Sequence, residues 1–279
     1  MSKEITIKNE FVEATISTKA AEVISFKKLS DNLETIWCRN PEFWRNCNPI
    51  LFPYTGPLID GKYTYEGREY FCGQHGFTRD AEFTITEAGK QEAELVLQSD
   101  FSTLRVYPFA FTLTVRYTLE GHKLLLNYRI TNRDDKPLPF NIGFHPAFNC
   151  PVDKNESFSD YCIEFQHEET LMLPDKVIPN GKYFSLKDVS VSPSFFYHNS
   201  QIKSDWVQLT NGKHTVRVGI AGYQTLGFWR KNENAPYVCI EPWHPVNDLP
   251  KANTFRPDSE NNLLAPNTEF ECGYYFEII

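Results

Sequence analysis

Residues 109–130 read FAFTLTVRYTLEGHKLLLNYRI, and apolar side chains occupy every second position on both sides of the Glu120-Gly121 turn. A period of two is typical of long antiparallel strands that have one face against a core. The apolar positions are Phe109, Phe111, Leu113, Val115, Tyr117, Leu119, Leu124, Leu126, Tyr128 and Ile130. The stretch therefore predicts two long strands joined by a tight turn.

The same alternation continues outward in both directions, whereas sustained helical periodicity and internal repeats are missing. Polar breaks and turn signals such as Asn211-Gly212 separate the runs. Further strands are predicted around residues 5–7, 12–16, 23–26, 63–65, 69–71, 140–144, 206–209, 216–220, 226–229, 237–240 and 270–279. We expect an all-β fold, a large sandwich of antiparallel sheets that forms one domain over residues 1–279.

Two passages lack this alternation. Residues 37–57 are rich in proline and aromatic residues and predict a long ordered loop packed on the sheet. Residues 151–204 are polar and contain several prolines, so only excursions and short strands are expected there.

Composition excludes several classes of function. The 279 residues include 28 Lys and Arg against 36 Asp and Glu, giving a net charge of −8, and no basic run is present. Nucleic acid and anionic membranes are therefore not expected as partners. No leader-like or membrane-spanning apolar stretch is present, and the seven cysteines form no CxxC pair. These features predict a cytoplasmic protein with reduced thiols.

Histidine 145 stands in the segment NIGFHPAFN, residues 141–149, at the end of a predicted strand. The proline that follows favours extended backbone at His145 and stops a helix from running through it. An imidazole held there can transfer a proton near neutral pH, although a buried structural histidine is the common alternative.

A second histidine lies in QHGFTRD, residues 74–80. Glycines at 73 and 76 bracket Gln74 and His75, which allows the backbone to approach a ligand closely. The alternative for His75 is a loop histidine without a function, and the alternative for Arg79 is a surface ion pair with Asp80.

An acid follows the predicted strand at residues 237–240, in the sequence CIEPW. Glu241 would be buried there, and carboxylates are rarely buried without a partner or a purpose. Trp243 beside it could belong to the core or form a platform for the face of a sugar. Together, His75, His145, Arg79 and Glu241 would make an acid–base site surrounded by hydrogen-bond donors.

These segments resemble the aldose 1-epimerase (galactose mutarotase) family, and within it the branch of LacX-like proteins. The Asn141-x-x-x-His145 motif resembles the segment with the acid histidine, QHGFTRD the first histidine segment, and CIEPW the segment with the general base. The runs IWCRNPEFW, NPILFPYTG and DGKYTYEGREY resemble the LacX-like pattern in the same order.

The resemblance implies a mutarotase-like supersandwich that interconverts the α and β anomers of an aldohexose without a cofactor or a metal. Glu241 would act as the base and His145 as the acid. The residues expected to bind the monosaccharide are His75, Arg79, Gln74, Asn141 and Trp243.

Two positions depart from the family pattern. Pro57 stands where mutarotases usually carry a substrate-contacting arginine, and the place of a substrate-binding aspartate falls near Pro193-Ser194, which has no acid. Asp188 and Asp205 are only candidates for that role. The proton-transfer pair is thus retained, while part of the sugar clamp differs.

Three alternatives remain open. The first is a non-catalytic carbohydrate-binding or sensing protein on the same scaffold. The second is a sugar-phosphate 1-epimerase, which is disfavoured because no second basic cluster accompanies Arg79 in the sequence. The third is a metal site formed by His75, His145 and Glu241.

Overall fold

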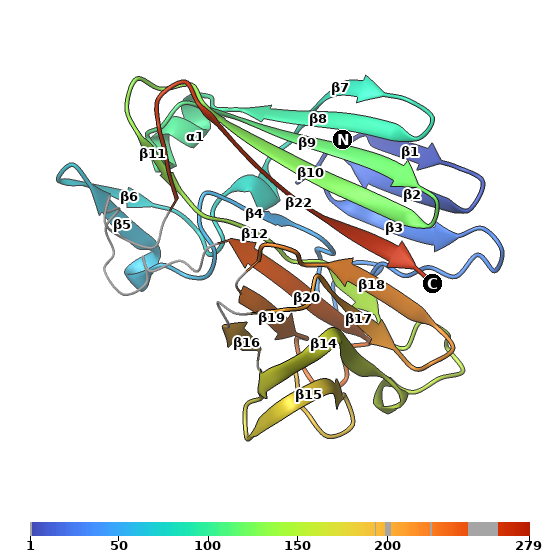
Figure 1. Ribbon diagram of the computed structural model, residues 1–279. Helices are drawn as coiled ribbons and strands as arrows, with labels where there is room; N and C mark the ends of the chain where they lie inside the picture. The colour runs from blue at the N-terminus through green and yellow to red at the C-terminus, as the bar shows by residue number, and fades with distance from the viewer. Residues whose placement is uncertain (1, 193, 199–201, 224, 245–261) are drawn as a thin grey trace.

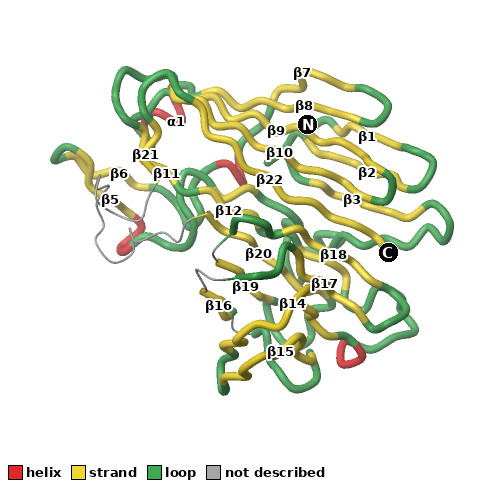
Figure 2. Tube along the Cα trace, viewed as in Figure 1, coloured by secondary structure: helices red, strands yellow, loops and turns green. Residues whose placement is uncertain are grey.

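The computed structural model describes residues 2–192, 194–198, 202–223, 225–244 and 262–279. Strands dominate the chain, as the yellow segments of Figure 2 show. This confirms the prediction of an all-β fold built from large antiparallel sheets. Among the described residues, no helix combines the length and the apolar character that crossing a membrane requires.

The largest sheet has nine strands in the order β15-β14-β17-β18-β22-β10-β9-β8-β7, and every neighbouring pair is antiparallel (Figure 1). Within this sheet, the predicted hairpin forms the adjacent strands β9 and β10 around the turn at Gly121. The strands are β7 Thr84–Ala88, β8 Glu92–Gln98, β9 Phe111–Glu120, β10 Lys123–Asn132, β14 Cys162–Met172, β15 Val177–Ser185, β17 Trp206–Thr210, β18 Thr215–Gly219 and β22 Glu269–Ile278.

Two smaller sheets pack on the nine-stranded sheet. One has the order β1-β2-β3; the other has six strands, β16-β19-β20-β12-β4, with β13 paired to β20. Their strands are β1 Glu4–Lys8, β2 Val12–Ser17, β3 Val23–Lys28, β4 Ile50–Leu51, β12 Ile142–Phe144, β13 Ala147–Asn149, β16 Phe195–His198, β19 Thr225–Trp229 and β20 Tyr237–His244. Two further pairs complete the described strands: β5 Lys62–Tyr65 with β6 Arg68–Phe71, and β11 Leu138–Phe140 with β21 Asn262–Leu264.

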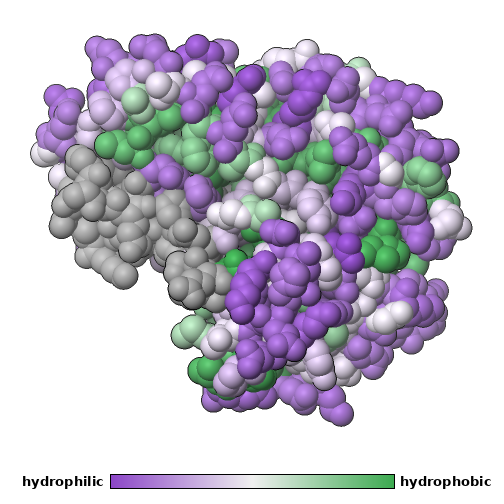
Figure 3. All heavy atoms as spheres, in the orientation of Figure 1, coloured by the Kyte–Doolittle hydropathy of each residue, from purple (hydrophilic) through white to green (hydrophobic). Residues whose placement is uncertain are grey.

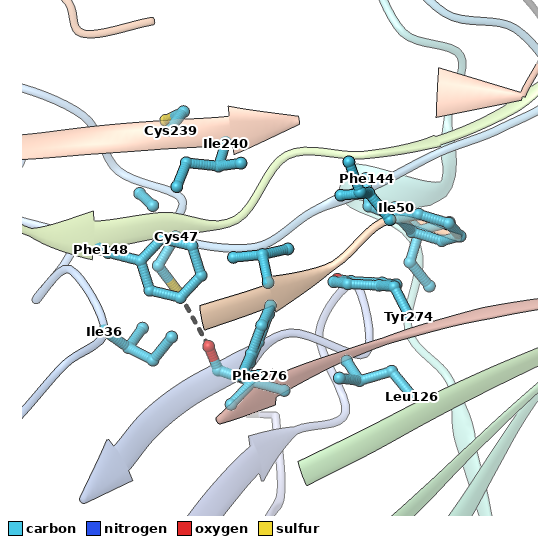
Figure 4. Packing of buried hydrophobic residues seen from close by; sticks show 14 of the residues in the cluster. Ile36, Cys47, Ile50, Leu126, Phe144, Phe148, Cys239, Ile240, Tyr274 and Phe276 are labelled. Atoms are coloured by element: carbon cyan, nitrogen blue, oxygen red, sulfur yellow. Dashed lines mark hydrogen bonds between the residues drawn. The ribbon is translucent and has the colours of Figure 1, made fainter. Parts of the chain in front are cut away.

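Aromatic side chains join the sheets into one core. Phe276 of β22 contacts Phe26 of β3, with ring centroids 6.4 Å apart, and Phe148 of β13, at 5.1 Å. Tyr128 of β10 packs on Phe144 of β12 at 4.2 Å. Figure 4 shows this packing between the strands that carry Phe276, Phe144 and Phe148. Polar residues cover most of the molecular face drawn in Figure 3. Many of the aromatic side chains are buried in the core.

Two expectations about local structure are wrong, those for residues 151–204 and for residues 140–144. Residues 151–204 contain the long strands β14 and β15. β15 forms the edge of the nine-stranded sheet and β14 lies next to it, and many side chains of both strands are exposed or only half-buried. A short helix, α1 Phe101–Val106, begins at Asp100, whose side chain accepts a hydrogen bond from the Thr103 amide, and it is too short to show periodicity. Residues 140–144 do not form one strand, because Asn141 separates β11 from β12.

Candidate active site

The strand register places His145 opposite Glu241. Strands β12 and β13 both pair with β20, so that Gly143 faces Trp243 and Ala147 faces Cys239. Along the chain, His145 lies midway between Gly143 and Ala147, and Glu241 lies midway between Cys239 and Trp243. His145 directly follows β12, as predicted for a strand end, whereas β20 continues through Glu241 to His244. The expectation that the strand ends before Glu241 is therefore wrong, because Pro242 is accommodated within β20.

Two glycines make room for the functional side chains on this face of the sheet. Gly227 of β19 pairs with Glu241, and a Cβ there would lie 2.8 Å from Phe196 and 3.1 Å from the Glu241 Cβ. A Cβ at Gly143 would lie 2.8 Å from the Trp243 ring. Larger residues at 143 and 227 would therefore displace the side chains of β20.

The two proposed proton-transfer groups meet in a buried environment. Nε2 of His145 lies 3.4 Å from Oε1 of Glu241, and the residues are 8% and 2% exposed. Burial, aided by the neighbouring His75, holds the pKa of His145 well below its usual value, while burial raises the pKa of Glu241 well above its own. Both groups are therefore neutral over a range of pH, and the pair then holds one proton.

A tight turn holds His75 against the segment that follows β4. His75 has a φ of 67°, its backbone N–H donates to the Gly56 carbonyl at 2.9 Å, and its Nδ1 accepts from the Gly56 N–H at 3.0 Å. Gly76 cannot be replaced easily, since its φ is 76° and a Cβ would lie 2.0 Å from the Phe52 carbonyl oxygen. Burial and the Arg79 charge lower the pKa of His75 to about 3, so the ring is neutral and carries its proton on Nε2.

The His75 ring lies beside the proton-transfer pair. Its centroid is 5.8 Å from that of His145 and 5.9 Å from that of Trp243, both in edge-on contact. Nε2 of His75 faces the side-chain amide of Gln74 at 3.0 Å. Arg79 lies in the short 3-10 turn Thr78–Asp80 and forms no ion pair within the described ranges, so the expected alternative of a pair with Asp80 is absent there.

One cavity of about 650 Å³ joins most of these groups. Its wall includes the predicted residues Gln74, His75, Arg79, His145, Glu241 and Trp243. Asn141 does not line it; this side chain is fully buried, and its backbone N–H donates to the Pro53 carbonyl at 2.8 Å. Any role of Asn141 would therefore be exerted through the position of β12 and His145.

The two departures from the family pattern can also be located. Pro57 and Ser194 line the cavity, so neither position supplies a charged group to the wall, while Pro193 lies outside the described residues. Asp188 and Asp205 are not part of the wall.

Sequence reasoning missed the residues that enclose the other side of His145. Its ring packs on Trp44 at 4.7 Å and against Trp229 at 5.3 Å. Phe43 and Lys231 extend the same side of the cavity wall. Trp44 comes from the proline-rich loop, where no periodic pattern marks which side chains point inward, so only the tertiary structure reveals it.

The donor atoms do not support His75, His145 and Glu241, the alternative left open by the sequence, as a set of metal ligands. Among the described residues, the His145, Cys239 and Glu241 donors lie within 4.8 Å of one another, and His75 is not part of this group. Nδ1 of His75 already accepts from the Gly56 N–H, so only Nε2 of this ring could contact a ligand.

Comparisons with known proteins agree with one another. A family model described as aldose 1-epimerase matches residues 3–218, a range that ends before Glu241. The chromosomal and plasmid LacX proteins of Lactococcus lactis subsp. lactis are each 31% identical over a 298-residue alignment that covers 99% of both chains.

Solved structures show the same relationship. A galactose mutarotase related enzyme from Lactobacillus acidophilus is 28% identical, with a TM-score of 0.86 over 99% of this chain and 97% of that one. A galactose mutarotase-like protein from Lactobacillus casei ATCC 334 is 26% identical, with a TM-score of 0.87 over 99% and 100%.

Proposed function

Because this chain belongs to the aldose 1-epimerase family, we propose that it interconverts the α and β anomers of an aldose by acid–base ring opening in the 650 Å³ cavity. The observation that carries the proposal is the cross-strand pair of His145 and Glu241, 3.4 Å apart and both in the cavity wall. Family membership supports the general chemistry. The roles of base and acid follow from the resemblance of the Glu241 and His145 segments to the family pattern, and the distance between the two groups is compatible with these roles.

The catalytic cycle needs one proton on the pair. Glu241 as carboxylate takes the proton from the anomeric hydroxyl while protonated His145 gives one to the ring oxygen, and the C1–O5 bond breaks. Rotation about C1–C2 and closure on the other face reverse both transfers. The reactive form differs from the neutral form only by transfer of one proton from Glu241 to His145, so no proton must enter from solvent.

The remaining groups would position the sugar. Neutral His75 can donate through Nε2 to a hydroxyl or the ring oxygen, and Arg79 can hold a hydroxyl. Trp243 would offer an apolar surface to one face of the ring.

The test is polarimetry on freshly dissolved α-D-glucose and α-D-galactose, at a pH where spontaneous mutarotation is slow. Positioned acid–base groups contribute about 10²–10⁴-fold, so Glu241→Gln and His145→Ala should each lower kcat/KM by that order. Glu120→Gln and His122→Ala, both outside the cavity, are the matched controls. Unchanged epimerisation by Glu241→Gln would rule out the mechanism, since an amide cannot act as the base.

A sugar-binding protein without catalysis is the second candidate. It is favoured by Pro57 and Ser194, which leave the wall without the arginine and the aspartate that the family pattern leads one to expect. Saturable binding of an aldose with no acceleration of mutarotation, for either anomer, would support this role.

A further inference from the structure

The wall of the active-site cavity has the opposite charge to the chain as a whole. The chain carries a net charge of −8, yet among the described residues of the wall the fully charged side chains are Arg79 and Lys231. Of the wall residues that the structure describes, Glu241 is the one acid, and burial favours its neutral form. A cleft lined by charges of one sign attracts ligands of the other sign.

Lys231 follows β19 and reaches the wall beside the loop that carries Phe43 and Trp44. Its Nζ donates to the Glu42 backbone carbonyl at 3.3 Å and forms no ion pair in the described part of the chain. An ammonium group has three N–H donors, so two remain for a ligand. The backbone contact thus leaves the charge uncompensated and holds it at the edge of the cavity.

Arg79 contributes the second charge from the turn after His75. It lies close enough to depress the pKa of both His75 and His145, so its field reaches the proton-transfer pair. The sequence showed no second cation to accompany it, because Lys231 is separated from it by more than half of the chain. The tertiary structure brings both to one cavity.

We infer that the preferred substrate is an aldose that carries an anionic group, a phosphate ester or a carboxylate, and that Lys231 recognises this group. The inference rests on the proposed epimerase function and names its substrate class. Lys231 thereby becomes a specificity-determining residue, while the neutral part of the sugar occupies the space between Trp243 and the proton-transfer pair.

The experiment compares anomer exchange, followed by NMR, for galactose, galactose 6-phosphate and galacturonate with the wild type. We expect kcat/KM to be at least about 10-fold higher for one of the anionic sugars than for galactose, and to fall as salt is added. Lys231→Met should remove that preference by lowering kcat/KM for the anionic sugar at least about 10-fold more than for galactose, while Lys231→Arg should retain it. Lys187→Met, an exposed lysine outside the cavity, is the matched control.

The outcomes separate this inference from the function on which it rests. Equal turnover of neutral and anionic sugars, or a preference that survives Lys231→Met, would overturn the inference while leaving the epimerase intact. No exchange with any of the sugars would instead contradict the proposed function. A preference for the phosphate over the uronate, or the reverse, identifies which anion the site takes.

Discussion

The shared proton of Glu241 and His145 sets the pH dependence of the reaction. Below the lowered pKa of His145 both groups are protonated and no base remains; above the raised pKa of Glu241 neither is protonated and no acid remains. We therefore expect a bell-shaped profile of kcat/KM against pH. Because the last proton is lost from the carboxyl group, Glu241→Asp should move the alkaline limb.

Initial rates from pH 4 to 10, corrected for spontaneous mutarotation, would check this assignment. Glu120→Asp, on the exposed end of β9, should leave both limbs unchanged. A Glu241→Asp profile in which only the acid limb moves would mean that the carboxyl group has an ordinary pKa and His145 a raised one.

We expect catalytic activity to require glycine at position 227, because Gly227 of β19 lies opposite Glu241 of β20. In Gly227→Ala the new methyl group would lie 2.8 Å from Phe196 and 3.1 Å from the Glu241 Cβ, closer than ordinary van der Waals contact with either. We expect kcat to fall at least about 10-fold, since displacements of about 1 Å at an active site can cost about 100-fold.

Gly219→Ala provides the control for this variant. It also places a methyl group against a ring, 2.3 Å from Tyr275, but on β18 and outside the cavity. It should lower the melting temperature without lowering kcat of the folded protein. Equal kcat for Gly227→Ala and the wild type would show that Glu241 tolerates displacement.

At the scale of elements, Glu22 fixes the position of the loop whose Trp44 ring packs on the His145 ring. Its carboxylate accepts the backbone N–H groups of Cys47 at 3.0 Å and Asn48 at 3.1 Å, and the residue is 4% exposed. Glu22→Ala would leave both donors buried without these partners, at a cost of about 1–3 kcal/mol each.

We expect Glu22→Ala to lower the melting temperature by at least about 4 °C and to raise KM, because Trp44 and Pro49 of the same loop line the cavity. Thermal unfolding and sugar titration of the variant would measure both effects. Glu10→Ala, at an exposed position, should change neither. A Glu22→Ala protein with wild-type stability would mean that water replaces the carboxylate at these amides.

For the whole molecule, the buried carboxyl group makes stability depend on pH. Because the folded-state pKa of Glu241 is raised above its ordinary value of 4.5, the folded protein binds more protons than the unfolded chain between the two values. The stability linked to this group is therefore complete below pH 4.5 and is lost as the pH rises through the folded-state pKa.

Glu241→Gln removes this titration. The melting temperature of Glu241→Gln minus that of the wild type should therefore be constant below pH 4.5 and increase above it. Scanning calorimetry from pH 4 to 9 would measure the difference, with Glu120→Gln expected to give a flat line. A difference that shrinks as the pH rises would show that the folded state favours the carboxylate.

The alternation of residues 109–130 by itself determined the class of fold. Side chains that alternate with a period of two share one buried face only when the segment is a strand of a β-sheet. The sequence also determined His145 and Glu241 as candidates, because an imidazole before proline and an acid among apolar residues stand out locally. It did not reveal β14 and β15, because the many exposed polar side chains of these two strands weaken the same signal.

Only the tertiary structure decided which residues meet. Alternation says that a side chain faces one side of a sheet but not which residue lies across from it, and the register that sets His145 opposite Glu241 depends on pairing with β20. Trp44 and Lys231 join the cavity through loops that carry no periodic signal. The charge of the site, positive within an acidic chain, is for this reason a property of the folded molecule rather than of any segment.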